Sequence, residues 1–322
     1  MNPIHVANFT DRDLTKAMAS SQTDHINDLA HYRANIIREM REGHQLAGIP
    51  LPWGKCAGDI ALPLKYISIL GGASGNKKST IALQLLLWAS KQFKVGFASF
   101  EMRMNYIPRM MAAVAAGVQE QGVSEKCVNE FLDYSTNRIY AYDQIGDVSV
   151  LRVLGAVEAF GQMGCKFVVV DSLMMVDLGD TTGSQQYQRE RSFVSALSGL
   201  ANLHDMHICL VTHTKKPEGN GGAEFVPNKN SIRGGGGITD IAAVVMLAHT
   251  DEKKAKLLQD KEKFGAVLSE KEEAYIDRAP CQRLIIAKNR FNSYQGTISL
   301  FQHTRSRQLL GDRSDRGMHF GY

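Results

Sequence analysis

A glycine- and lysine-rich segment between a predicted strand and a predicted helix constrains the fold of this chain most strongly. Residues 65–70 form an apolar run that predicts a strand, and residues 79–93 have the apolar spacing of a helix. The segment that joins them, residues 71–80, reads GGASGNKKST. In such a loop, glycines let backbone N–H groups point at phosphate oxygens, with the N-terminus of the next helix behind them. The order strand, loop and helix therefore predicts a phosphate-binding loop.

Two side chains of this loop have the chemistry that a bound nucleotide needs. Lys78 can reach the β- and γ-phosphates, and the hydroxyl of Ser79 can bind Mg²⁺. The loop departs from the usual pattern G-x-x-x-x-G-K-[ST] because Lys77 replaces the second glycine, and a side chain there strains the turn or crowds the phosphates. Taken alone, the stretch is otherwise a basic loop ahead of a surface helix. We expect the nucleotide to contact Gly72, Ala73, Ser74, Gly75, Asn76, Lys77, Lys78, Ser79 and Thr80.

Further along the chain, short apolar runs alternate with helical patterns. The expected strands cover residues 95–100, 167–170, 207–212, 242–248 and 283–287. The expected helices cover residues 104–118, 151–163 and 191–203. Continuous runs of Val, Ile and Leu separated by helices are typical of a parallel sheet that is covered on both faces. The sequence therefore predicts an α/β fold with a mainly parallel sheet.

Three of these strands end in a side chain that suits phosphate chemistry, namely Glu101, Asp171 and His213. Because the carboxyl ends of parallel strands meet at the ligand edge of a sheet, we expect all three near the phosphate loop. There Asp171 can hold the water shell of Mg²⁺, Glu101 can deprotonate an attacking water, and His213 can hydrogen-bond a γ-phosphate. Taken singly, each acid is otherwise a helix cap or a turn residue, and the histidine a partner of backbone or water.

Two cations stand at alternate positions near the C-terminus, Lys288 and Arg290. Residues i and i+2 of an extended segment project to the same side. Two cations placed in this way can bind one phosphate, most simply that of a neighbouring subunit, as an arginine finger does.

The N-terminal part differs from the α/β pattern. Residues 1–23 are polar and predict a mobile arm, whereas residues 24–42 have the apolar spacing of a helix. An amphipathic helix buries its apolar stripe, either on its own domain or on a neighbouring subunit. The stripe consists of Leu29, Tyr32, Ile36, Ile37 and Met40.

Two further segments stand out by composition. Residues 217–237 are rich in Gly and Asn, with an unbroken row from Gly234 to Gly237, and predict a long loop that is functional or disordered. Residues 251–277 are dense in charges of both signs and predict a solvated helix or a helical insertion.

Charge and cysteine content limit the partners and the compartment. The 322 residues carry 37 Lys+Arg and 33 Asp+Glu, and the net charge of +4 is compatible with nucleic acid binding without requiring it. No apolar run approaches the roughly 18 residues of a membrane-spanning helix, and the N-terminus lacks the pattern of a secretory signal. Five scattered cysteines without a Cys-x-x-Cys pair predict reduced thiols in a cytosolic protein, and neither disulfides nor a structural zinc site.

Six segments of the chain, in this order, resemble the ATPase domain of the ring-shaped replicative DNA helicases, the DnaB-like superfamily 4, and especially their phage members. They read GGASGNKKST, VGFASFEM, FVVVDSLMM, LVTHTKKPEG, NSIRGGGGITDIAAVVMLAH and LIIAKNRFNSYQGT. The resemblance implies an arm and linker helix over residues 1–45, a RecA-like P-loop NTPase core over residues 46–312 and a tail over residues 313–322. It also implies a cytoplasmic protein, in the bacterial host if a phage encodes it.

The resemblance implies roles for the residues of the expected nucleotide site. Lys78 and Ser79 would bind phosphate and Mg²⁺, with Asp171 as the carboxylate associated with the metal. Glu101 would be the catalytic base, and His213 would sense the γ-phosphate.

Residues outside that site receive roles from the same resemblance. Lys288 and Arg290 would act on the ATP of the adjacent subunit. Lys229, Arg233 and Gly234, on the glycine-rich loop, would line a central channel and contact the phosphates of single-stranded DNA.

The implied function is that of a replicative helicase. As a homo-hexamer it would hydrolyse ATP or another NTP with Mg²⁺, move 5′→3′ on single-stranded DNA and unwind replication forks. No primase module or DnaB-type N-terminal collar fits in the first 45 residues, so we expect a separate primase, with a polymerase or a helicase loader as further partners. Asp240 stands where the family commonly has Gln or Glu, which leaves open how hydrolysis is coupled to DNA movement.

Two other functions stay open at this point. A non-hydrolysing DNA-binding or helicase-modulating ring protein would account for Lys77 in the phosphate loop. A RecA-type recombinase would share the same core, and filaments in place of closed rings in electron micrographs would distinguish it.

Overall fold

The chain divides into two units, Met1–Gln45 and Leu46–Tyr322, and each is described by itself. The structure is a computed structural model that describes residues 28–42, 48–54, 60–179, 183–215, 226–291 and 294–320. The predicted N-terminal arm, residues 1–23, lies outside these residues.

The first unit contains a short 3₁₀ helix, η2 (Leu29–Tyr32), that continues into the α-helix α2 (Arg33–Glu42). The Asp28 carboxylate begins η2 by accepting a hydrogen bond from the N–H of Ala30 at 2.8 Å. Residues 24–27, where the predicted helix begins, lie outside the described residues. The helix is thus present over the part of its predicted range that the structure describes.

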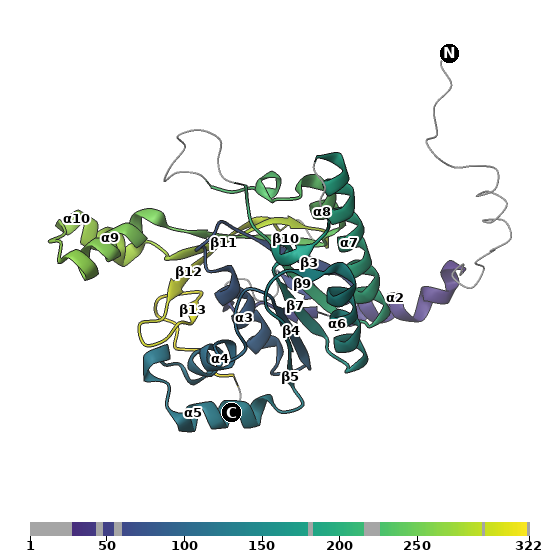
Figure 1. Ribbon diagram of the computed structural model, residues 1–322, viewed down its shortest axis with the longest axis horizontal. Coiled ribbons are helices and arrows are strands. Elements are labelled where there is room, and N and C mark those ends of the chain that lie inside the picture. The colour runs from purple at the N-terminus through teal and green to yellow at the C-terminus, as the bar shows by residue number, and fades with distance from the viewer. Residues whose placement is uncertain are drawn as a thin grey trace, which may run out of the picture. The chain divides into compact units, whose positions relative to one another are not determined.

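A nine-stranded sheet forms the frame of the second unit (Figure 1), in the order β13-β12-β11-β10-β3-β9-β7-β4-β5. Six neighbouring strands are parallel: β10 (Val244–Thr250), β3 (Ile67–Gly71), β9 (His207–Val211), β7 (Phe167–Asp171), β4 (Val95–Ser99) and β5 (Ile139–Asp143). Three antiparallel strands extend the sheet beyond β10: β11 (Gln282–Asn289), β12 (Gly296–Gln302) and β13 (Leu309–Leu310). The predicted α/β fold with a mainly parallel sheet is confirmed.

Helices cover both faces of this sheet and enclose two apolar cores (Figure 1). One core includes side chains of α3 (Lys78–Ala89), α4 (Ile107–Ala116) and α5 (Glu125–Ser135). The other includes side chains of α6 (Val150–Gln162), α7 (Ser184–Leu203) and α8 (Gly235–Ile241). In β3, Leu70 enters the first core and Ile69 the second, because successive strand residues point to opposite faces. Burial on both faces explains the continuous apolar runs of these strands.

The charged segment that predicts a helical insertion forms α9 (Glu252–Phe264) and α10 (Glu270–Arg278) between β10 and β11. The Asp251 carboxylate caps α9 by accepting a hydrogen bond from the N–H of Lys254 at 2.9 Å. Gly265 ends α9 with a φ of 62°, and Ser269 and Glu272 form the capping box that begins α10. Local hydrogen bonding thus sets the boundaries, and the prediction of a helical insertion is confirmed.

The glycine row that predicts a loop is in fact mostly helical. Gly234 precedes α8 with a φ of 89°, and Gly235 to Gly237 form the first turn of that helix. A β-carbon at Gly237 would lie 2.6 Å from the ring of Tyr187, so glycine allows α8 to pack closely against α7. The prediction of a loop through residue 237 was therefore wrong, because this glycine row allows close helix packing. Residues 216–225 of the same segment lie outside the described residues.

The remaining elements are small. Two two-stranded sheets pair β1 (Gly48–Pro50) with β2 (Ala61–Pro63) and β6 (Val148–Ser149) with β8 (Val176–Asp177). Three further 3₁₀ helices are η4 (Glu120–Gly122), η5 (Leu173–Met175) and η6 (Lys229–Ser231). No helix within the described ranges is long and apolar enough to cross a membrane.

Candidate active site

A cavity of about 220 Å³ lies at the carboxyl edge of the parallel strands, beside the phosphate loop. Five side chains that the sequence analysis expects to act together line it: Lys78, Ser79, Glu101, Asp171 and His213. From the predicted phosphate loop, Ser74, Gly75, Lys77 and Thr80 line the same cavity. Residues from four separate strand ends are therefore brought within one small volume.

The other residues of the loop fix its path. A β-carbon on Gly72 would lie 2.7 Å from the carbonyl oxygen of Ala248, so this position requires glycine. The amide of Asn76 donates a hydrogen bond to the same oxygen at 3.1 Å. The carbonyl of Ala73 accepts a hydrogen bond from Lys78 Nζ at 2.9 Å. The loop is thus tied to strand β10 as well as to its own helix.

Lys78 brings a positive charge into this cavity from the first turn of α3. Its side chain is buried, and burial lowers its pKa, while the charges of Asp171 and Glu101 act in the opposite direction. An ammonium in such a weakly screened position acts strongly on a bound anion. Lys78 is therefore suited to hold phosphate oxygens.

Ser79 and Asp171 form a pair of oxygen ligands across the cavity. The Ser79 hydroxyl donates a hydrogen bond to Asp171 Oδ2 at 2.7 Å. Burial raises the pKa of Asp171 to about 6, and the bond from Ser79 opposes that shift. Hydroxyl and carboxylate oxygens fit Mg²⁺, which usually completes its shell with phosphates and water. Among the described residues, no cluster of three or more His, Cys, Asp or Glu side chains provides a full protein ligand set.

Glu101, His213 and Ser172 form a connected group opposite the loop. Glu101 Oε1 lies 3.8 Å from His213 Nε2 and accepts a hydrogen bond from the Ser172 hydroxyl at 2.5 Å. Burial lowers the pKa of His213, and the charge of Lys78 adds to the effect, which favours a neutral imidazole. Ser172 was not identified from the sequence. Its bond fixes the orientation of the partly exposed Glu101 carboxylate, which suits a base that faces water.

Lys77 takes the backbone conformation that explains why this position is usually glycine. Its φ of 54° and ψ of 26° lie in the left-handed region, which costs a residue with a side chain about 1–2 kcal/mol. Its ammonium donates a hydrogen bond to the side-chain oxygen of Gln302 at 2.8 Å. The strain expected from the sequence is thus present, and the side chain makes its hydrogen bond to β12.

Lys288 and Arg290 lie on one side of the extended segment, as the spacing predicts, but they are not among the residues that line the cavity. Lys288 Nζ donates hydrogen bonds to the carbonyls of Thr239 and Asp240 at 2.8 and 3.0 Å. The Arg290 guanidinium donates to the same Asp240 carbonyl at 2.8 Å. Both cations thus sit at the C-terminus of α8, where the helix dipole favours positive charge.

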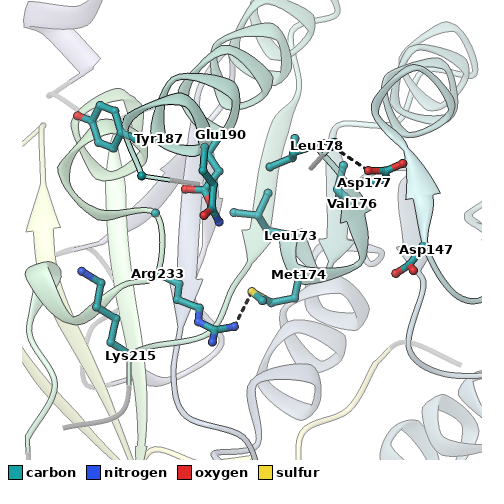
Figure 2. Close-up of a pocket in the computed structure, with 14 residues that line it drawn as sticks. Asp147, Leu173, Met174, Val176, Asp177, Leu178, Tyr187, Glu190, Lys215 and Arg233 are labelled. Carbon is teal, nitrogen blue, oxygen red and sulfur yellow. Dashed lines mark hydrogen bonds between the residues drawn. The ribbon is translucent and has the colours of Figure 1, made fainter. Parts of the chain in front are cut away.

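A second cavity, of about 900 Å³, lies between α7 and the segments that follow β7 and β9 (Figure 2). Arg233 and Gly234, two of the three residues expected to contact DNA, line it, whereas Lys229 lies in η6 and is not among its lining residues. Lys215 adds a second cation, and the carboxylate of Glu190 belongs to the same wall. Burial raises the pKa of Glu190, and the charges of Arg233 and Lys215 oppose the shift.

Backbone hydrogen bonds connect the two cavities. The N–H of Arg233 donates to the carbonyl of His213 at 2.9 Å, and the N–H of Thr214 donates to the carbonyl of Gly72 at 3.2 Å. Thr214 also pairs with Ile232 in a β-bridge. The phosphate loop, the end of β9 and the segment that carries Arg233 therefore form one hydrogen-bonded unit.

Comparisons with known proteins agree with this geometry. The model of a family described as AAA domain matches residues 56–219. A DnaB-like replicative helicase, whose structure was solved together with its interactions with primase, has 15% identity and a TM-score of 0.65, over 93% of this chain and 70% of that chain. A second solved structure, that of an isolated ATPase domain, has 15% identity and a TM-score of 0.68, over 88% of this chain and 99% of that chain. No curated protein sequence matches. The structural likeness shows a shared RecA-like fold.

Replacing Asp171 by Asn should remove a pH dependence of stability. Because burial raises the pKa of Asp171 to about 6, from an ordinary value of 3.8, the folded state binds this proton more tightly than the unfolded chain. The resulting stabilisation is complete below about pH 4 and is lost as the pH rises through about 6. The loss in the free energy of unfolding is on the order of 3 kcal/mol.

Urea unfolding in EDTA at about pH 4 and about pH 7.5 measures this effect. We expect the wild type to lose stability across the interval and Asp171→Asn, which keeps a partner for Ser79, to lose much less. Asp133→Asn, at an exposed carboxyl, is the matched control and should behave as the wild type. Equal pH dependence of Asp171→Asn and the wild type would contradict the assignment.

Proposed function

Because the chain belongs to the AAA domain family, we propose that it is a helicase motor that hydrolyses a nucleoside triphosphate to move along single-stranded DNA. One observation carries the proposal: Lys78, the Ser79–Asp171 pair and the Glu101–His213 pair line the same cavity. The likeness in fold to a DnaB-like replicative helicase and to a second solved ATPase domain supports it.

In the proposed reaction, a water molecule attacks the γ-phosphorus of ATP while the bond to the β-phosphate oxygen breaks. Glu101, oriented by Ser172, accepts the proton of this water. Lys78 stabilises the negative charge on the phosphate oxygens. Mg²⁺, held by Ser79 with Asp171 beside it, would neutralise charge on the β- and γ-oxygens when bound. The products are ADP and inorganic phosphate.

The neutral His213 would report loss of the γ-phosphate to the DNA-binding side. Its carbonyl accepts the backbone hydrogen bond of Arg233, so a shift of His213 reaches the segment that carries Arg233 directly. Arg233, Gly234 and Lys215 belong to the second cavity, and Lys229 stands nearby in sequence. Cations on such a segment suit contact with DNA phosphates regardless of base sequence.

The proposed assembly is a homo-hexameric ring in which Lys288 and Arg290 act on the nucleotide of the adjacent subunit. Their pairing with the Asp240 carbonyl holds both cations at one helix end, ready to meet an anion from outside the chain. Movement 5′→3′, unwinding of replication forks and a separate primase partner belong to the same proposal. A primase partner draws support from the structural relative that was studied with primase.

Lys78→Ala should abolish nucleotide hydrolysis that is stimulated by DNA. The substitution removes the charge that holds the phosphates, so we expect the rate to fall by at least about 100-fold with single-stranded DNA present. Release of inorganic phosphate with Mg²⁺, with and without DNA, is the measurement. Lys126→Ala, at an exposed lysine of α5, is the matched control and should keep the wild-type rate.

Two results would contradict the motor. Nucleotide binding by the wild type without hydrolysis, with or without DNA, would favour the helicase-modulating ring protein. Hydrolysis that survives in Lys78→Ala would place the reaction outside this cavity.

A mixture of two inactive variants tests action between subunits. Arg290→Ala keeps its own Lys78, and Lys78→Ala keeps its own Arg290. If Arg290 acts on the neighbour, some interfaces of a mixed ring contain both groups, and random mixing should restore roughly one quarter of the wild-type rate. Phosphate release from the equimolar mixture, with ring formation checked by light scattering, is the measurement. A mixture that stays inactive while forming rings would assign Arg290 to its own subunit.

A further inference from the structure

The tip of the phosphate loop is attached to the antiparallel strands at the edge of the sheet. The amide of Asn76 donates to the carbonyl of Ala248 on β10 at 3.1 Å, and the carbonyl of Asn76 accepts from the Gln282 amide on β11 at 2.8 Å. Next to it, Lys77 Nζ donates to the Gln302 side-chain oxygen, at the end of β12, at 2.8 Å. Three successive strands therefore hold two adjacent residues of the loop.

Of these three attachments, the one made by Lys77 is the easiest to exchange. The hydrogen bond between Lys77 and Gln302 joins two exposed groups, and Gln302 itself is exposed on the last residue of its strand. Lys77 also lines the cavity that holds Lys78 and Ser79. Its ammonium stands on a flexible stem of four carbons. The side chain thus has a neutral amide as its partner on one side and the expected position of the phosphates on the other.

A phosphate oxygen is a much stronger partner for an ammonium than an amide oxygen, because the hydrogen bond then joins two opposite charges. We propose that Lys77 exchanges Gln302 for a phosphate oxygen when a nucleotide occupies the cavity, and that this exchange releases the end of β12. The exchange rests on the proposed function only in requiring that nucleotide phosphates bind beside Lys78.

The exchange gives the strained residue a function. Lys77 occupies a left-handed backbone position that glycine would take without strain, so a side chain there costs stability. The released Gln302 pairs through its backbone with Leu309 of β13, so occupancy of the cavity is reported to the outermost strands of the sheet. A charge that leaves β12 upon binding is a local switch between two partners.

A fixed anchor is the competing explanation, in which Lys77 and Gln302 only stabilise the strained loop. The two accounts predict opposite effects for Gln302→Ala. In the exchange, Gln302 competes with the phosphate, so its removal tightens nucleotide binding. For the anchor, its removal loosens the loop and weakens binding or leaves it unchanged.

Binding of fluorescent ATP and ADP analogues to the full chain, without DNA, tests the exchange. We expect Lys77→Ala to weaken binding by about tenfold and Gln302→Ala to tighten it by about threefold. The double variant should bind as Lys77→Ala does, because Gln302 has nothing left to compete for. Lys77→Arg should keep most of the affinity, whereas Lys77→Gly, which relieves the backbone but lacks the charge, should bind as weakly as Lys77→Ala.

Thermal melting of each variant separates folding from binding, and Gln92→Ala, at another exposed glutamine, serves as the control. Nucleotide binding by the wild type with no tightening in Gln302→Ala would overturn the exchange and leave the proposed function standing. Failure of the wild type to bind any nucleotide would overturn the proposed function, and the exchange with it.

Discussion

Parallel pairing of the central strands is the constraint on which the site depends. In this ladder Ser99 of β4 stands opposite Asp171 of β7, and Leu70 of β3 stands opposite Val211 of β9. The strands therefore end at the same level, and the side chains that follow them converge. A slip of one residue would turn every apolar side chain of a strand to the wrong core. The chemistry of the cavity thus rests on apolar residues that do not line it.

The antiparallel extension has a different part in the account. Strands β10, β11 and β12 attach to the tip of the phosphate loop through Asn76 and Lys77, and they follow the long helical insertion α9–α10 or precede it. The loop is therefore held from two sides, by its own helix and by the edge of the sheet. This double attachment is compatible with a strained residue in the loop, because the surrounding hydrogen bonds fix the backbone path.

The order of the elements and the members of the site were predictable from the sequence, whereas contacts between distant residues were not. Strands such as residues 167–170 are buried on both faces, and their apolar runs have no other ready explanation. Helix α5 was missed because it buries only one described side chain, Phe131, and its sequence is largely polar. The bonds of Ser172 to Glu101 and of Lys77 to Gln302 join residues 71 and 225 positions apart, and no local pattern indicates such pairs.

Single-turnover hydrolysis by Glu101→Gln tests most directly whether this cavity is a hydrolytic site. The substitution keeps the size of the side chain and its bond to Ser172 but removes the base. The account predicts that the rate of the chemical step falls by at least about 100-fold while the Kd for ATP stays within about twofold of the wild type. A variant that binds ATP normally and hydrolyses it at the wild-type rate would contradict the account.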